Sequence, residues 1–184
     1  EPKLVSGYIH NDTLDVYVVT DYLKPEKGSL KIEVKGLDCR SYSTKTLRVN
    51  VPSNSSKMVY QVPVKDILAE ADPAQSYVRM IYTDAEGCQH SNLRFFVNQK
   101  DMRFLDPDIS FDVKESGDYK EITLTSDVFA RAVYVSVKDS ELVHFSDNFF
   151  DLYPGEPYTV KVKINMSAEE LASRLQYNCV NKFL

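Results

Sequence analysis

Hydrophobic and polar positions alternate along this chain in short runs. Runs rich in Val, Ile, Tyr, Phe and Thr recur roughly every 10 to 15 residues, separated by clusters of Gly, Pro, Asn, Asp and Ser, a pattern typical of antiparallel β-sandwiches. Between Leu30 and Lys35 apolar and charged side chains alternate, so one strand face should meet a core and the other water. The pattern predicts six strands in the first half of the chain: residues 14–20, 30–35, 46–51, 58–64, 77–83 and 93–97.

The second half repeats this organisation with one helix added. Ser167 and Glu170 have the spacing of a capping box, which predicts one or two helical turns. Residues 65–69 should form a single helical turn, because Asp72-Pro73 follows and proline disfavours helix in the preceding residue. The strands predicted here are residues 109–114, 120–126, 132–138, 143–145, 158–164 and a closing strand at 176–180.

The predicted fold class is all-β, with two consecutive immunoglobulin-like antiparallel β-sandwich domains at residues 1–103 and 104–184. A length of 184 residues accommodates two sandwiches of roughly 80 to 100 residues each. Charge also changes near this boundary. The first part carries 14 basic and 13 acidic side chains and the second 8 basic and 14 acidic. Turn residues around positions 102–108 predict a short, stiff linker.

Composition excludes several classes of function. The formal net charge of −5 without a basic cluster argues against nucleic acid as a partner. No apolar run approaches the roughly 18 to 20 residues that span a bilayer, so we expect no membrane insertion. None of the three histidines shares a metal-ligand spacing with the cysteines, and the Asp-rich stretches 106–108 and 147–151 lack an EF-hand pattern. We therefore assign no metal and no cofactor.

The cysteines predict no disulfide framework, because three of them cannot all pair within one chain. Cys39 and Cys88 both lie in polar turn sequences, whereas Cys179 lies in the closing segment. Three free thiols are the default, and one bridge between Cys39 and Cys88 stays open as an alternative.

One segment of the second half stands out chemically. Residues 146–156 read SDNFFDLYPGE, which combines apolar anchors, backbone-bonding Asn and Asp side chains, and a Pro-Gly turn. This much apolar surface should be buried in the domain or against a neighbour. Glu156 is expected to be a solvated turn residue. The candidate packing and docking motif comprises Asp147, Asn148, Phe149, Phe150, Leu152, Pro154, Gly155 and Glu156.

Three segments carry a resemblance to a known family. Residues 147–156, followed by the alternating strand 158–162, resemble the C-terminal immunoglobulin-like domain of glycoside hydrolase family 2 β-mannosidases. Residues 92–109 are similar, more loosely, to the junction between two sandwich domains in these enzymes. Residues 14–21 are similar to the strand that opens the earlier sandwich. Only the segment from Phe149 to Glu156 is specific on its own.

The resemblance implies an accessory segment of a longer enzyme, with the catalytic and N-terminal domains of a parent β-mannosidase as partners. Family 2 enzymes carry their two catalytic glutamates on a (β/α)₈ barrel, and this chain lacks the alternating βα pattern of a barrel. We therefore assign no catalytic residue to it. The resemblance also implies an exported setting.

Two other functions stay open from the sequence. A carbohydrate-binding module that takes mannose-containing glycans is one, because the chain has 12 Tyr and 9 Phe, although it lacks Trp. The tyrosines predicted to lie in turns, and therefore to be available for stacking on sugars, are Tyr8, Tyr22, Tyr42 and Tyr153. A surface adhesion or protein-interaction module that binds through a strand edge is the other.

Overall fold

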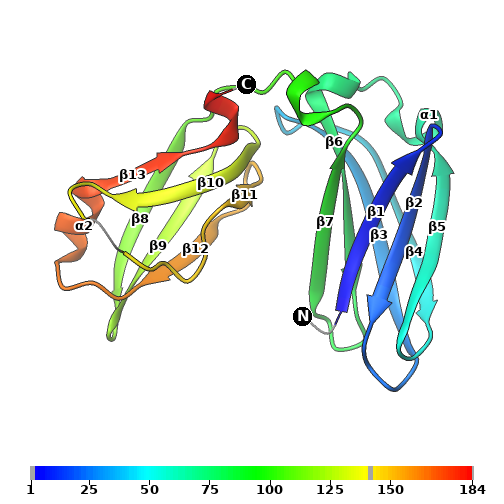
Figure 1. The fold of residues 1–184 in the computed structure, drawn as a ribbon, viewed down its shortest axis with the longest axis horizontal. Coiled ribbons are helices and arrows are strands. Elements are labelled where there is room, and N and C mark those ends of the chain that lie inside the picture. Colours follow the sequence, from blue (N-terminus) through cyan, green and yellow to red (C-terminus); the bar gives the residue numbers. More distant parts are fainter. Residues whose placement is uncertain (1–2, 141–142, 184) are drawn as a thin grey trace. The chain divides into compact units, whose positions relative to one another are not determined.

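The computed structural model describes residues 3–140 and 143–183. They form two compact units, Glu1–Arg103 and Phe104–Leu184. In both units every paired strand is antiparallel, and the helices are short (Figure 1). The predicted all-β fold class is confirmed.

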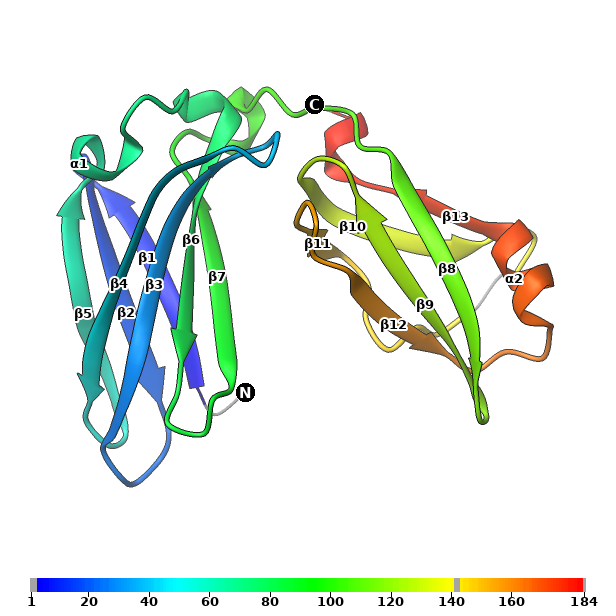
Figure 2. The same ribbon diagram turned by 180° about the vertical axis from the view of Figure 1, so that it is seen from behind.

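The first unit is built from a three-stranded and a four-stranded sheet (Figures 1 and 2). The smaller sheet has the order β1-β2-β5, with β1 at Lys3–His10, β2 at Thr13–Thr20 and β5 at Ser55–Pro63. The larger has the order β4-β3-β6-β7, with β4 at Ser41–Val51, β3 at Glu26–Gly36, β6 at Ser76–Thr83 and β7 at Gln89–Phe95. The helical turn expected at residues 65–69 is α1 (Val64–Leu68), and 3₁₀ turns follow at Pro73–Gln75 and Gln99–Asp101.

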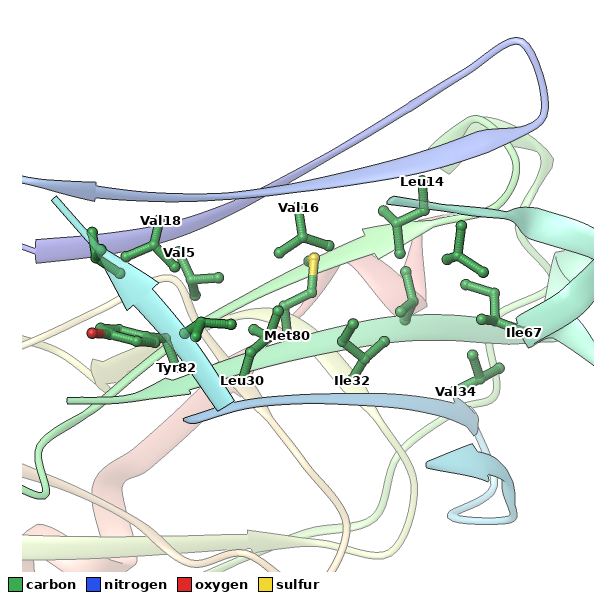
Figure 3. Packing of buried hydrophobic residues seen from close by; sticks show 14 of the residues in the cluster. Val5, Leu14, Val16, Val18, Leu30, Ile32, Val34, Ile67, Met80 and Tyr82 are labelled. Carbon is green, nitrogen blue, oxygen red and sulfur yellow. The ribbon is translucent and has the colours of Figure 1, made fainter. Parts of the chain in front are cut away.

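Alternation along these strands produces the core of the first unit. Val16 and Val18 of β2 are fully buried, whereas Tyr17 and Val19, which alternate with them, are partly exposed. Figure 3 shows them facing Leu30, Ile32 and Met80 of the opposite sheet. Burying such aliphatic side chains contributes roughly 1.5 to 3 kcal/mol each. The sandwich is therefore held together mainly by apolar side chains that meet between its two sheets.

The second unit is a sandwich of two three-stranded sheets. One has the order β12-β9-β8, with β8 at Ile109–Ser116, β9 at Tyr119–Ser126 and β12 at Tyr158–Val162. The other has the order β11-β10-β13, with β10 at Ala130–Val137, β11 at Phe150–Leu152 and β13 at Leu175–Asn178. The capped helix is α2 (Ala168–Arg174), in which the Ser167 hydroxyl accepts from the Glu170 N–H, and a 3₁₀ turn follows at Val180–Lys182.

Several predictions of secondary structure need correction. Strands β3 and β4 begin earlier than predicted, and the short strand β11 was not predicted. Strand β1 was not predicted, because Gly7 interrupts its apolar pattern; a Cβ there would lie 2.4 Å from the Met80 sulfur. The strand predicted at residues 143–145 does not form, and Phe145 makes only an isolated bridge to Val162. The closing strand ends at Asn178, because the chain turns into the 3₁₀ helix at Val180.

Candidate functional site

The motif at residues 147–156 runs along one edge of β10, and Asn148 makes the first link. Its side-chain Oδ1 accepts from the Val135 N–H at 2.7 Å, and its Nδ2 donates to the Val135 carbonyl at 2.9 Å. A primary amide presents the same donor and acceptor as a peptide group. A single side chain therefore replaces a strand residue at this edge.

Asp151 makes the second link and stabilises a bulge in β10. The pairing between β10 and β11 shifts between Ala130 and Val133, and Ala132 takes a φ of +48°. A bulge leaves backbone groups without a ladder partner. The Asp151 carboxylate accepts from the Ala132 N–H at 2.9 Å and pairs with the Arg131 guanidinium at 2.5 Å. Asp151 thus satisfies the backbone that the bulge leaves unpaired.

The apolar anchors of the motif enter the core of the second unit. Leu152 is fully buried and Phe150 is 7% exposed. The Phe150 ring stacks on Tyr158 with a centroid distance of 4.3 Å. The Tyr158 hydroxyl donates to Asp147 Oδ2 at 2.5 Å. Burial and this hydrogen bond raise the pKa of Tyr158 to about 12.

Phe149 is turned the opposite way. Its side chain is 67% exposed and its φ is +64°, a region that bulky residues rarely adopt. Its N–H donates to the Val133 carbonyl at 2.8 Å, so the backbone is fixed on β10. The ring lies 5.1 Å from the ring of Tyr134, which is itself 42% exposed. The motif therefore presents an aromatic pair to the surface, here called the Phe149–Tyr134 pair.

The motif ends in the predicted Pro-Gly turn. Gly155 has a φ of +75°, and the Glu156 N–H donates to the Tyr153 carbonyl at 3.0 Å. Pro154 followed by a residue of positive φ matches a type II turn. Glu156 is exposed at the end of this turn. Packing within the domain thus occupies most of the motif, and Phe149 is its outward-facing apolar member.

Sequence reasoning missed Asn181, which is buried close to the same bulge. Its Nδ2 donates to the carbonyls of Leu105 and Phe129, each at 2.8 Å, and its Oδ1 accepts from the Arg131 N–H at 2.8 Å. The residue follows the predicted closing strand, where an isolated Asn gives no sequence signal. Asn181 therefore ties the start of the second unit to β10.

A second group of polar residues, also missed, lies at one end of the first unit. Lys3 is 3% exposed, and its Nζ lies 2.8 Å from carboxylate oxygens of both Glu26 and Asp84 and 3.0 Å from Glu86. His90 lies 3.3 Å from Asp84. These residues come from β1, β3 and the β6–β7 hairpin, far apart in sequence. We call Lys3, Glu26, Asp84 and Glu86 the Lys3 cluster.

Electrostatics favour the charged forms of Lys3 and Asp84. Burial opposes the charge on Lys3, but the hydrogen bonds with Asp84, Glu26 and Glu86 prevail and raise the pKa of the ammonium group. The hydrogen bond from Lys3 lowers the pKa of Asp84 against the opposing effect of burial, with help from His90 and the Cys88 N–H. Asp84 Oδ1 also accepts from the backbone N–H groups of Glu86 and Cys88. Asp84 therefore shapes the hairpin as well as balancing Lys3.

The other candidates from the sequence are dispersed. Within residues 3–140 and 143–183 no three His, Cys, Asp or Glu side chains are placed to hold a metal ion. All three cysteines are unbridged thiols, with Cys39 and Cys88 exposed and Cys179 buried. In the same part of the chain no helix is long and apolar enough to cross a membrane.

The tyrosines proposed for sugar stacking are only partly in turns. Tyr8 and Tyr42 lie in strands β1 and β4, so the prediction that they occupy turns is wrong. Tyr153 follows β11 and packs against the buried Phe129 ring at 5.6 Å. Tyr22 lies in the β2–β3 turn and is 48% exposed. Of the four, Tyr22 therefore best combines a turn position with exposure.

Comparison with family models identifies both parts of the chain. Residues 12–101 match the model Mannosidase_ig, a Mannosidase Ig/CBM-like domain. Residues 104–182 match the model Ig_mannosidase, an Ig-fold domain. Among curated proteins, none matches the chain.

Solved structures share the fold over nearly the whole chain. The β-D-mannosidase from Dictyoglomus thermophilum has a TM-score of 0.78 at 21% identity, and the alignment covers 98% of this chain and 22% of that enzyme. The exo-chitosanase CsxA from Amycolatopsis orientalis has a TM-score of 0.62 at 16% identity, with coverage of 98% and 26%. This chain thus spans about a quarter of the length of these enzymes. The chain belongs to the immunoglobulin-like domain families of mannosidases, and the resemblance seen in its sequence is confirmed.

Proposed function

We propose that this chain is the non-catalytic C-terminal accessory part of a β-mannosidase and packs against the catalytic and N-terminal domains of that enzyme. Both matching family models are named for mannosidases, and the domains follow each other in one chain. The enzymes that share its fold are about four times longer. β-Mannoside hydrolysis then belongs to the parent enzyme, and this chain contributes a docking surface.

The observation that carries the docking part of the proposal is the Phe149–Tyr134 pair. Holding a bulky residue at positive φ costs of order 1 to 3 kcal/mol, and such strain clusters where function requires it. Here the backbone bond to Val133 and the Asn148 side chain impose that conformation. The strain places an apolar ring in solvent when the domain is alone. Contact with a neighbouring domain would bury it.

The surroundings of the pair have the composition of an interface. Tyr134 and Ser136 of β10 are paired in register with Asn178 and Gln176 of β13. These four positions carry no Lys, Arg, Asp or Glu, and an aromatic centre with few charges distinguishes interface cores from ordinary surface. A surface of this composition is better suited to contact with a folded domain than to exposure to solvent.

Substituting Phe149 by Asn tests the proposal, because Asn tolerates positive φ and removes the apolar ring. The isolated chain should keep its melting temperature or gain slightly from relief of strain. The complete enzyme should melt at a lower temperature, because the apolar contact of Phe149 with its neighbour is lost. Phe183→Asn is the matched control, because Phe183 is 72% exposed in the same unit. Equal effects of Phe149→Asn in both proteins would overturn the docking role.

The absence of catalysis in this chain is tested separately with an aryl β-mannoside. We expect turnover by the complete enzyme and none above background by the isolated chain. Turnover by the isolated chain that a single Glu or Asp substitution abolished would contradict the accessory assignment.

A further inference from the structure

The end of the first unit that holds the Lys3 cluster is also hollowed. Three adjoining cavities of about 620, 610 and 320 Å³ lie where β3 begins, where β4 ends and at the β6–β7 hairpin. Lys27 lines all three of them. Figure 1 shows that the β2–β3 and β6–β7 turns and the start of β1 lie at the same end of this unit. Volumes of this size are those of small-molecule sites.

The 610 Å³ cavity has one apolar wall and one charged wall. Tyr22 and Leu23, in the β2–β3 turn, line one side, and they are 48% and 84% exposed. Glu86, from the β6–β7 hairpin, lines the other side, and Lys3 and Glu26 also face the cavity. The Tyr22 ring stands 4.6 Å from the Lys3 ammonium group. An aromatic face thus lies next to hydrogen-bonding groups of both signs.

Local bonds hold these walls in place. The Tyr22 N–H donates to the Thr20 hydroxyl at 3.1 Å, and the Asn54 N–H donates to the Tyr22 carbonyl at 2.7 Å. On the opposite side, Asp84 accepts from the N–H groups of Glu86 and Cys88. Ligand binding would therefore lose little conformational entropy from ordering this site, which favours binding.

The charges around the cavity select the class of ligand. Lys3, Lys24 and Lys27 line it together with Glu26 and Glu86, so an anion or a cation would each meet like charge as well as opposite charge. A neutral ligand rich in hydroxyl groups can donate to the carboxylates and accept from the exposed ammonium groups of Lys24 and Lys27. A sugar ring adds an apolar face for Tyr22. We infer that this end of the first unit binds a neutral oligosaccharide, with Tyr22 as stacking platform and Glu86 as polar contact.

The arrangement favours a chain of sugars over a single ring. The three cavities adjoin each other around Lys27, so consecutive rings of one chain can occupy neighbouring hollows. The site lies in the first unit, whereas the Phe149–Tyr134 pair lies in the second. This inference therefore stands or falls independently of the proposed docking function.

Titration of the full 184-residue chain with β-1,4-mannohexaose tests the inference, with binding followed by amide NMR shifts. We expect saturable shifts at Tyr22, Leu23 and residues 84–87. Tyr22→Ala should weaken binding at least tenfold. Tyr119→Ala is the matched control and should leave binding unchanged, because Tyr119 is 47% exposed and also lies near a lysine, Lys163. Glu86→Gln, which keeps the shape but removes the charge, should weaken binding at least threefold.

Two further ligands test which class of oligosaccharide the site binds. Cellohexaose binding in place of mannohexaose would support a site for neutral oligosaccharides with another sugar preference. Hexagalacturonate binding as tightly as either neutral sugar would overturn the selection by charge. Absence of binding by both neutral hexasaccharides, or binding that Tyr22→Ala leaves unchanged in a variant that melts like the wild type, would overturn the site.

Discussion

The two units make the edges of their sheets by different means. In the first unit β2 pairs with β1 and β5 along its whole length through the backbone. In the second unit β11 has only three residues, and the Asn148 and Asp151 side chains complete the edge of β10. Backbone pairing accepts almost any side chain, whereas side-chain pairing requires a particular one. This difference explains why residues 147–156 have a characteristic sequence, whereas the strands are recognised only by their general alternation.

The units also differ in where they place charge. The first buries Lys3 among three carboxylates, and the second pairs its charges near the surface, as between Lys114 and Asp112. We therefore expect the second unit to depend most on its motif and the first on its buried cluster.

Phe150→Ala should cost the second unit about 4 kcal/mol, within the range for emptying a buried aromatic site. Phe150 is 7% exposed and stacks on Tyr158. Urea denaturation followed by NMR signals from each unit measures the effect. Phe149→Ala is the matched control and should cost far less, since its ring is exposed. Equal losses from both changes would remove the distinction between the inner and outer residues of the motif.

Lys3→Met should destabilise the first unit by about 3 kcal/mol, because removing one partner leaves buried carboxylates uncompensated. The carboxylates of Asp84 and Glu26, whose side chains are 5% and 11% exposed, would then lose their ammonium partner. The same denaturation experiment reports this loss on signals from the first unit. Lys114→Met should cost far less, because its pair with Asp112 is exposed. An effect of Lys3→Met as small as that would show that the cluster does not stabilise the fold.

Asn148→Asp should cost the second unit about 2 kcal/mol, because a carboxylate cannot donate to the Val135 carbonyl and would repel it. Asn165→Asp, at an exposed position of the same unit, serves as control and should be nearly neutral. Urea denaturation followed by NMR signals from each unit should show the loss only in the first variant. Equal stability of the two variants would mean that the bond to the Val135 carbonyl contributes little.

The smallest effect concerns alkaline pH and Tyr158. Its pKa in the folded state is raised from 10.0 to about 12, so the stability it contributes is present below pH 10 and is lost as the pH rises through 12. Because its partner Asp147 is exposed, the loss should stay below about 1 kcal/mol. Tyr158→Phe should flatten the stability of the second unit across this window. A slope equal to the wild type's would assign the pH dependence to other groups.

The sequence predicts those parts of the fold that depend on local chemistry. Alternation located β3, and the Ser167–Glu170 spacing located α2. Alternation did not predict that Glu33 is buried. Its burial depends on the central position of β3 in the sheet and on its ion pair with Lys31 at 2.5 Å, and neither can be read from the alternation. The Asn11-Asp12 turn, in which both residues have positive φ, was a signal for the missed β1–β2 hairpin.

The sequence predicts one candidate site better than the other, because one depends on neighbouring residues and the other on residues far apart in the chain. The motif is continuous in sequence, so its composition identified it as apolar and turn-forming. The Lys3 cluster joins residues 3, 26, 84 and 86, which only the folded chain brings together. The outward direction of Phe149 follows from its positive φ, which the sequence FF does not reveal.

We propose that the motif anchors its own domain with Phe150 and meets a neighbouring domain with Phe149. Hydroxyl-radical footprinting of the isolated chain and of the complete enzyme measures the accessibility of both rings directly. We expect Phe149 to be oxidised and Phe150 protected in the isolated chain, and both to be protected in the complete enzyme. Oxidation of Phe149 at the same rate in both proteins would contradict the claim.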